Sequence, residues 1–517
     1  MVHDAAVVGG GHNGLICAAY LARAGLDVVV FEARGEVGGC ASTVPALGAR
    51  VNACNCDHLS IRTTPILEEL ELGRHGLRYL DADPAQLSLL WEGGAPWFCF
   101  HRVERTLESL RLSHPGEVEG YRRYIAAALP VARLLFELAL GVPTRRRLLA
   151  LAARSPVPAA RAVAWSRMST EAVLRSFFAE DALVAPGGVI GPVLWGLAPS
   201  TPGTGLGALG YAVRHLVRVG RPVGGSGALP AAIAAAVEAA GGTVRTSARA
   251  VAILADRSRV RGVRLEGGEE VEARAVVVAC DPRRALVEWL REPPVGAGPL
   301  VERWRARRPY DGYQSKVDAL VAAPPRVPAV EDHAARLGVD EALIPTAIVA
   351  PGGRGLDEAA RAMAAGRVAE CPPAMVNVPS ALDAAMRPPG GGHVLSLEVL
   401  FTPYALAGGW AGSAEPERWL AALAGIARPG FLAGVVARRA VTPDTWELEF
   451  SMERGHALAF GRSPLALLAG HDPELTRYET PVPGLLLTGA ATFPGAGVWG
   501  ASGRNTAAVA QSYLERR

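Results

Sequence analysis

The chain of 517 residues has almost no lysine: of its 53 basic residues only Lys316 is a lysine, and the others are arginines. Its seven cysteines are odd in number and scattered from position 17 to position 371. A secreted disulfide scaffold is short and dense in cysteine, so we interpret these residues as reduced thiols. No second Cys or His pair lies at the spacing of a zinc finger or ribbon, and we expect no metal site.

The charge also shows little bias, because 53 basic residues face 50 acidic ones. Composition therefore gives no reason to expect nucleic acid as a partner. The chain starts with an apolar strand instead of the basic and apolar regions of a signal peptide, which predicts a cytoplasmic protein. The most apolar long run, 126–142, is interrupted by Pro130, Arg133 and Glu137, which makes it a poor membrane span. Peripheral contact with the inner face of the membrane is an alternative that the sequence leaves undecided.

What the sequence does contain is a glycine turn between a strand and a helix. After the apolar strand 5–8 comes Gly9-x-Gly11-x-x-Gly14, then a helix of small residues and a second strand that ends at Glu32. In this βαβ context the glycines allow a tight turn and the close approach of the backbone to a pyrophosphate. The helix N-terminus offers free N–H groups to the phosphates, and the acidic residue accepts hydrogen bonds from a ribose. An acid at this place favours FAD or NAD over NADP.

Hydrophobic periodicity and turn residues predict an α/β protein in three parts. A discontinuous Rossmann-like domain that binds the dinucleotide is expected over 1–85, 221–285 and 451–517. A helical insertion on the substrate side is expected over 86–220. A substrate domain with a mixed sheet is expected over 286–450.

Two more motifs narrow the choice of cofactor. Arg34-x-x-x-Gly38-Gly39-Cys40-Ala41 follows the acidic residue, and a glycine-rich turn, 489–500, precedes the last helix. These motifs resemble those of the phytoene-dehydrogenase-like FAD-dependent oxidoreductases, in the flavoprotein superfamily that also holds amine oxidases and Rab GDP-dissociation inhibitors. The resemblance implies an FAD-binding domain whose cofactor contacts are Gly9, Gly11, His12, Asn13, Gly14, Glu32, Ala33, Arg34, Gly38, Gly39, Cys40, Ala41, Val251, Gly489, Ala490, Val498, Trp499 and Gly500. For Val251, an ordinary core position is the alternative. The sequence departs from many flavoproteins at Ala490, where they carry an aspartate.

Two residues are candidates for assisting the chemistry, Lys316 and His58. Lys316 falls on an expected strand, and in the amine oxidases that the chain resembles a strand lysine holds a water beside the flavin. A solvated lysine at a strand end is the alternative. His58 lies in a stretch that passes beside the flavin in this superfamily, where it would serve as a base or polar anchor. A histidine that is buried and packed is the alternative.

The resemblance implies an oxidoreductase that removes a hydride from a C–H bond of an apolar or amphipathic small molecule, as a dehydrogenase or desaturase. Because no second Gly-x-Gly-x-x-Gly follows a strand, we expect oxygen, a quinone or another carrier as electron acceptor. A flavin amine oxidase is the alternative enzyme, and a non-catalytic protein like the GDP-dissociation inhibitors is the alternative of another class. The stretch 121–154, with apolar runs and three consecutive arginines, is expected to cover the active site or to lie on a membrane surface.

Overall fold

The first sheet gathers seven strands from three distant stretches of the chain. The computed structural model describes all residues except 1, 55, 308–310, 341–344, 457–471 and 517. Strands β12, β1, β2 and β9 run parallel in that order, β18 lies parallel on the other side of β12, and β10 and β11 continue the sheet antiparallel. The bounds are β1 His3–Val8, β2 Val28–Phe31, β9 Thr243–Arg245, β10 Ala250–Ala255, β11 Val260–Leu265, β12 Glu270–Val278 and β18 Leu485–Leu487.

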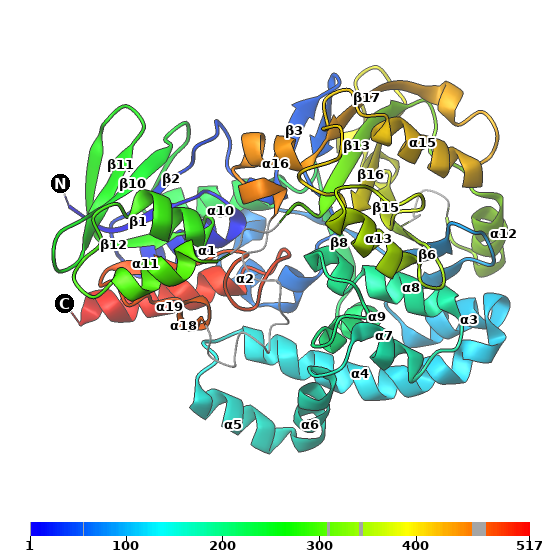
Figure 1. Cartoon of the computed structure of the whole chain (residues 1–517), viewed down its shortest axis with the longest axis horizontal. Helices are drawn as coiled ribbons and strands as arrows, with labels where there is room; N and C mark the ends of the chain where they lie inside the picture. Colours follow the sequence, from blue (N-terminus) through cyan, green and yellow to red (C-terminus); the bar gives the residue numbers. More distant parts are fainter. Residues whose placement is uncertain (1, 55, 308–310, 341–344, 457–471, 517) are drawn as a thin grey trace.

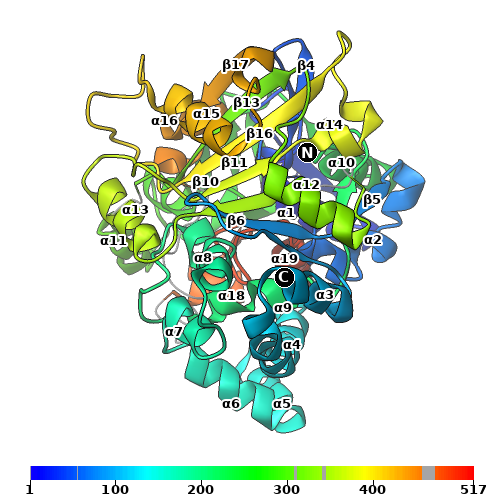
Figure 2. The ribbon, with the colours of Figure 1, turned by 90° about the vertical axis from the view of Figure 1, so that its right-hand side faces the viewer.

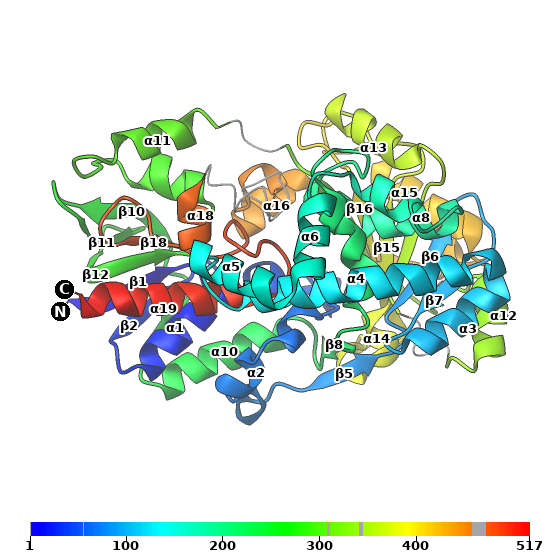
Figure 3. The same ribbon diagram turned by 90° about the horizontal axis from the view of Figure 1, so that it is seen from below.

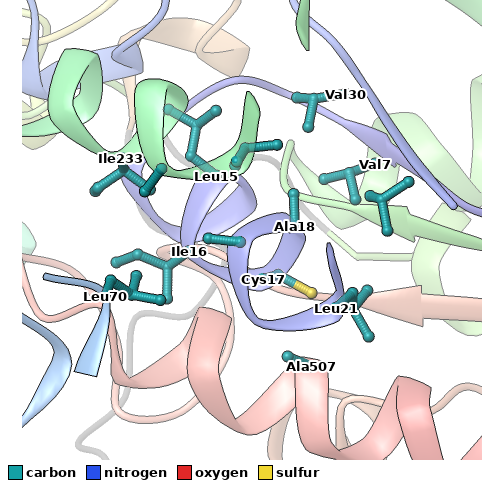
Figure 4. Close-up of a cluster of buried hydrophobic side chains, with 14 of the residues drawn as sticks. Val7, Leu15, Ile16, Cys17, Ala18, Leu21, Val30, Leu70, Ile233 and Ala507 are labelled. Carbon is teal, nitrogen blue, oxygen red and sulfur yellow. The ribbon is translucent and has the colours of Figure 1, made fainter. Parts of the chain in front are cut away.

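Helices cover both faces of this sheet, which is why β1 and β2 are apolar on both sides. On one face lie α1 (His12–Arg23), α10 (Ala228–Ala239) and α19 (Ala501–Glu515) (Figure 3). Figure 4 shows Leu15 and Ile16 of α1 in one buried cluster with Val7 of β1, Ile233 of α10 and Leu70. On the other face lie α11 (Gly298–Arg305) and α18 (Pro473–Arg477). We expected 298–305 in the substrate domain, but the buried Trp304 packs it on the first sheet.

The second sheet has the order β17-β13-β16-β15-β14-β6-β7 and is antiparallel except for the pair β14 and β6. Its outer face packs on α12 (Pro328–Leu337) and α15 (Glu415–Ile426). The strands are β6 Gln86–Leu90, β7 Trp97–Cys99, β13 Gln314–Val321, β14 Ala347–Ala350, β15 Ala374–Asn377, β16 His393–Leu400 and β17 Val435–Val441. The expected helical insertion over 86–220 is therefore wrong at its start, because β6 and β7 complete this sheet.

Residues 103–213 of that stretch are mainly helical and lie below the second sheet in Figure 2. Buried aromatic side chains hold it together, among them Tyr121 and Tyr211, which pack on Trp97 of β7. Its helices are α3 Val103–Ser113, α4 Val118–Ala139, α5 Arg145–Arg154, α6 Pro156–Trp165, α7 Thr170–Arg175, α8 Asp181–Val189 and α9 Gly210–Val213. Among the residues that the structure describes, no helix has the length and apolarity needed to cross a membrane.

Short elements join the two sheets (Figure 1). They include two antiparallel pairs of strands, β3 with β4 and β5 with β8. The remaining bounds are β3 Thr43–Ala46, β4 Ala49–Asn52, β5 Tyr79–Ala82, β8 Val219–Pro222, α2 Ile66–Glu69, α13 Gly355–Ala364, α14 Pro379–Leu382 and α16 Pro443–Phe450. The predicted fold class, a Rossmann-like domain with a mixed-sheet and helical substrate part, is confirmed.

Candidate active site

A cavity of about 650 Å³ runs between the first sheet, the second sheet and the helical insertion. Its wall at one end is the glycine turn after β1 and the glycine-rich turn before α19. At the other end the wall consists of side chains from α4, from the loops around α9 and from the second sheet. Three parts of the chain thus meet at one site. The cavity is concave and largely apolar, as is typical of cofactor and substrate sites.

The turn after β1 has the geometry that a pyrophosphate requires. A methyl group added to Gly11 would meet no atom within 4 Å, so its Cα faces open space in the cavity. A methyl group added to Gly14 would lie 2.1 Å from the carbonyl oxygen of Gly9, so the helix packs directly against the turn. One glycine therefore leaves room for a ligand, and the other permits close packing of helix and strand.

Two helix N-termini meet at this end of the cavity. Helix α1 begins after Gly11, and α19 begins after Gly500. The first turns touch, because the Gly503 N–H donates to Asn13 Oδ1 at 3.4 Å and a methyl group on Gly503 would lie 2.2 Å from the Asn13 carbonyl oxygen. Both helix dipoles thus place partial positive charge beside the cavity, where a diphosphate or another anionic group would be stabilised.

Glu32 lies at the end of β2 on the cavity wall, with only 8% of its surface exposed. Its Oε2 accepts the Gly10 N–H at 2.8 Å, and its Oε1 accepts the Arg34 N–H at 2.9 Å. Each carboxylate oxygen can accept a further hydrogen bond, so the fixed side chain suits the hydroxyl groups of a ribose. The open space at Gly11, the paired helix N-termini and this carboxylate together fit FAD.

The cavity wall includes every predicted cofactor residue except Val251 and Gly500. At Val251 the pairing of β10 with β11 shifts its register between Ala250 and Ala252, and the wall is formed by Arg249 and Ala250 instead. Gly500 caps α19 with a φ of 72°, and a methyl group there would lie 2.6 Å from Ile16, in the core. It therefore positions the helix and does not face the cofactor space.

Lys316 lies on β13 as expected, but its side chain is fully buried and is not on the cavity wall. Its Nζ donates to the carbonyl oxygen of Asn52 and forms an ion pair of 2.7 Å with Asp318. Arg439 pairs with the same aspartate at 3.0 Å. The alternative of a solvated lysine is therefore wrong. The ammonium group is held between Asn52 of β4 and Asp318 of its own strand, away from the cavity wall.

The residue that faces the cavity beside Lys316 is Glu398, directly across the ladder on β16. Only 4% of its surface is exposed, and in the described part of the chain no hydrogen bond to its carboxyl group is found. Burial raises the pKa of Glu398 to about 7, an effect that the charge of Lys316 opposes and that of Asp318 strengthens. Sequence reasoning missed this group, although one acid in the apolar strand His393–Leu400 was a usable signal.

His58 is enclosed, with no exposed surface, and is not on the cavity wall. Its Nε2 lies 2.7 Å from Ser226 Oγ and its Nδ1 lies 3.0 Å from the Tyr79 hydroxyl group. Burial lowers the pKa of His58 to about 3, and the nearby His12 adds to the effect. Both ring nitrogens are engaged in hydrogen bonds inside the protein, so the structure does not support contact of this histidine with a substrate.

A second polar group lies at the other end of the cavity, around Asp57. Its carboxylate pairs with Arg221 at 2.7 Å and accepts a hydrogen bond from Thr346. Burial opposes the charge, but Arg221 and these hydrogen bonds hold the pKa of Asp57 below its usual value. Arg214 lines the same region, and its positive charge acts in the same direction. Neither Asp57 nor Arg214 was predicted, because nothing local in the sequence marks them.

Comparison with known proteins agrees with the geometry of the cofactor end. Residues 7–61 match the model of an NAD(P)-binding Rossmann-like domain, and residues 187–510 match that of the flavin containing amine oxidoreductases. The chain belongs to this family of flavin oxidoreductases. It is therefore an enzyme with FAD as cofactor, and the alternative of a non-catalytic binding protein is not supported.

Proteins that are similar to this chain differ widely from it in sequence. A mouse protein named pyridine nucleotide-disulfide oxidoreductase domain-containing protein 2 is 29% identical over 98% of this chain and 93% of its own length. The zeta-carotene-forming phytoene desaturase of Myxococcus xanthus is 28% identical over 59% of this chain and 53% of its own. The structure of cyclohexylamine oxidase from Brevibacterium oxydans has a TM-score of 0.59 at 17% identity and covers 100% of this chain and 99% of its own. The last likeness concerns the fold alone.

Proposed function

We propose that this flavoenzyme is a dehydrogenase or desaturase that takes a hydride from a C–H bond of an apolar or amphipathic organic molecule. The observation that carries the proposal is the apolar wall of the cavity beyond the cofactor turns. The helical insertion supplies most of it, with Ala132, Leu135, Phe136, Leu138, Ile190, Leu194, Leu206, Leu209 and Val213. Such a wall excludes water and favours a substrate that gains free energy by leaving it.

Helix α4 ties this wall to the cofactor turn. Its Phe136 packs on Trp499 with ring centroids 4.5 Å apart, and both side chains line the cavity. Bound FAD supplies the acceptor for the hydride. The protein's own residues hold the substrate against that acceptor and keep solvent away, and Glu398 is placed to take up or release a proton at its carboxyl group. The similarity to a phytoene desaturase supports the same assignment.

An anaerobic experiment tests the proposal. The purified holoenzyme is mixed with long-chain alkenes and isoprenoids, and in parallel with primary amines, while the flavin absorbance is recorded. We expect bleaching with the apolar compounds, followed by reoxidation when oxygen or a quinone is admitted. Bleaching with amines alone would instead make the enzyme an amine oxidase, and a protein that binds FAD but is reduced by neither class would contradict both assignments.

We also propose peripheral contact with an anionic membrane through α5 and α6. The stretch 141–170 contains six arginines and no acidic residue. Three of its apolar side chains point outward, with exposed fractions of 71% for Leu149, 64% for Val157 and 50% for Val163. Helices that combine arginines with exposed apolar side chains are typical of segments that lie on anionic lipid.

Vesicle sedimentation tests this contact. The protein should sediment with vesicles that contain phosphatidylserine and stay in solution with purely zwitterionic vesicles. Replacing Leu149 and Val157 by serine should release it without loss of bound FAD. Equal sedimentation of wild type and variant would show that α5 and α6 are not the contact.

A further inference from the structure

Arg214 lines the end of the cavity away from the cofactor turns, and among the described residues no carboxylate forms an ion pair with it. Directly after α9, its Nη1 donates to the Gly210 carbonyl oxygen at 2.8 Å, while its Nε is buried without a hydrogen-bond partner in the described part of the chain. Its neighbours differ: Arg218 pairs with Asp81 at 3.4 Å, and Arg221 pairs with Asp57 at 2.7 Å. Nothing in the described structure offsets the charge of Arg214 in the same way.

Two acids, Asp57 and Asp83, lie in the same surroundings as Arg214, and both accept hydrogen bonds from other groups. Arg221 neutralises Asp57, whose two carboxylate oxygens bind Arg221 and Thr346. Asp57 therefore has little capacity left to pair with Arg214. A half-buried guanidinium group whose buried Nε has no acceptor costs free energy, and part of that cost is recovered when an anion binds.

The surroundings of Arg214 restrict which anion can reach it. The wall of this end includes five apolar side chains, Leu59, Ala85, Leu209, Val213 and Val219, beside Asp57 and Thr346, whose polar groups are bound to each other. A small hydrophilic anion would lose its hydration there and gain few contacts. A molecule with an apolar body and an anionic end satisfies both the wall and the guanidinium group, and a planar carboxylate matches the donor geometry of arginine.

We propose that Arg214 binds the carboxylate of an otherwise apolar substrate, so that the enzyme acts on an amphipathic carboxylic acid. This inference rests on the proposed function, which it sharpens from an apolar or amphipathic molecule to one with a negatively charged end. It also assigns orientation, because a substrate held by its carboxylate at Arg214 presents its apolar body to the remaining cavity.

Binding of three ten-carbon probes to the holoenzyme tests the inference: decanoate, decan-1-ol and decylamine. Binding is followed by the fluorescence of the tryptophans on the cavity wall, which include Trp195 and Trp446, and independently by equilibrium dialysis. Decanoate should bind wild type at least about tenfold more tightly than decan-1-ol. Arg214→Gln should weaken decanoate by at least about tenfold and leave decan-1-ol unchanged. Arg214→Lys should restore part of the affinity.

Arg218→Gln is the matched control, because Arg218 lies four residues further along the chain at the surface, and this variant should bind decanoate like wild type. Equal affinity of wild type for decanoate and decan-1-ol would overturn the proposal even if Arg214→Gln failed to fold. Unchanged decanoate affinity in a folded Arg214→Gln variant would overturn it too. If neutral alkenes bleach the flavin but the enzyme does not prefer decanoate, only the proposed anion site is rejected. If no apolar compound reduces the flavin, the proposed function itself is rejected.

Discussion

Alanine substitutions at Gly11 and Gly14 separate the binding of FAD from the stability of the fold. A methyl group at Gly11 meets no protein atom within 4 Å, and the residue has an extended backbone with φ −71° and ψ 164°. Gly11→Ala should therefore leave the apoprotein as stable as wild type or raise its stability by about 0.4–1 kcal/mol. The methyl group does occupy the space that the pyrophosphate needs, so FAD affinity should fall.

The magnitude follows from ligand linkage. At an FAD concentration of one hundred times the dissociation constant, bound cofactor adds about 2.7 kcal/mol to the stability of wild type. Gly11→Ala should lose most of this increment, which thermal or urea unfolding with and without FAD measures directly. A Gly11→Ala variant that keeps both the increment and a full flavin spectrum would refute the assignment of this turn to the pyrophosphate.

Gly14→Ala is the contrasting variant. Its methyl group would lie 2.1 Å from the Gly9 carbonyl oxygen, so strand and helix must move apart. We expect a loss of about 1–3 kcal/mol or more in the apoprotein, before any cofactor is added. Unfolding of both apoproteins side by side checks the contrast, and equal stability of the two variants would contradict the packing described for α1.

Three further predictions concern the buried polar residues. Because the folded pKa of Glu398 is raised from 4.5 to about 7, the folded carboxyl holds a proton that the unfolded one has lost, and wild type becomes less stable as the pH rises. The stability of Glu398→Gln relative to wild type should thus increase by roughly 3 kcal/mol between pH 4 and pH 8 in urea unfolding, and a constant difference would contradict this. Lys316→Met should lower the free energy of unfolding by about 3–5 kcal/mol, since it removes a buried cation from Asp318 and Glu398. A variant with normal stability that no longer reduces the flavin would instead place the lysine at the flavin. His58→Gln should lower stability by about 1–3 kcal/mol through its lost hydrogen bonds, yet leave the rate of flavin reduction per folded molecule unchanged between pH 5 and 8.

The glycine turn after β1 could be predicted from the sequence because its contacts are local. The turn at Gly9 to Gly14 lies between adjacent elements, and the acid at the end of β2 follows within one βαβ unit. Val251 was predicted only from the family resemblance, which carries no information on local strand register, and the structure shifts the register of β10 between Ala250 and Ala252. The predicted start of the helical insertion at residue 86 was wrong because β6 pairs with β14, which lies more than 250 residues further along the chain.

The burial of Lys316 required information that no single strand contains. Its strand alternates polar and apolar residues, Gln314 to Val321, which is typical of one buried and one solvated face. In the structure the polar face is also covered, by β3 and β4, and the lysine is balanced by Asp318 and by Glu398 on the next strand. The pattern indicated the strand correctly, but only tertiary packing decides which side meets water.

These differences explain why family membership establishes the cofactor and not the substrate. The groups at the substrate end come from separate elements: Asp57 from the loop after β4, Arg214 from the residue after α9, and Glu398 from β16. None of the three belongs to the glycine turns at the cofactor end, so each can change without altering those turns directly. Within one fold the substrate end is thus free to vary while the cofactor end stays fixed. Substitutions that distinguish substrates therefore belong at Arg214 and Glu398, where this chain places its unpaired charge and its titratable acid.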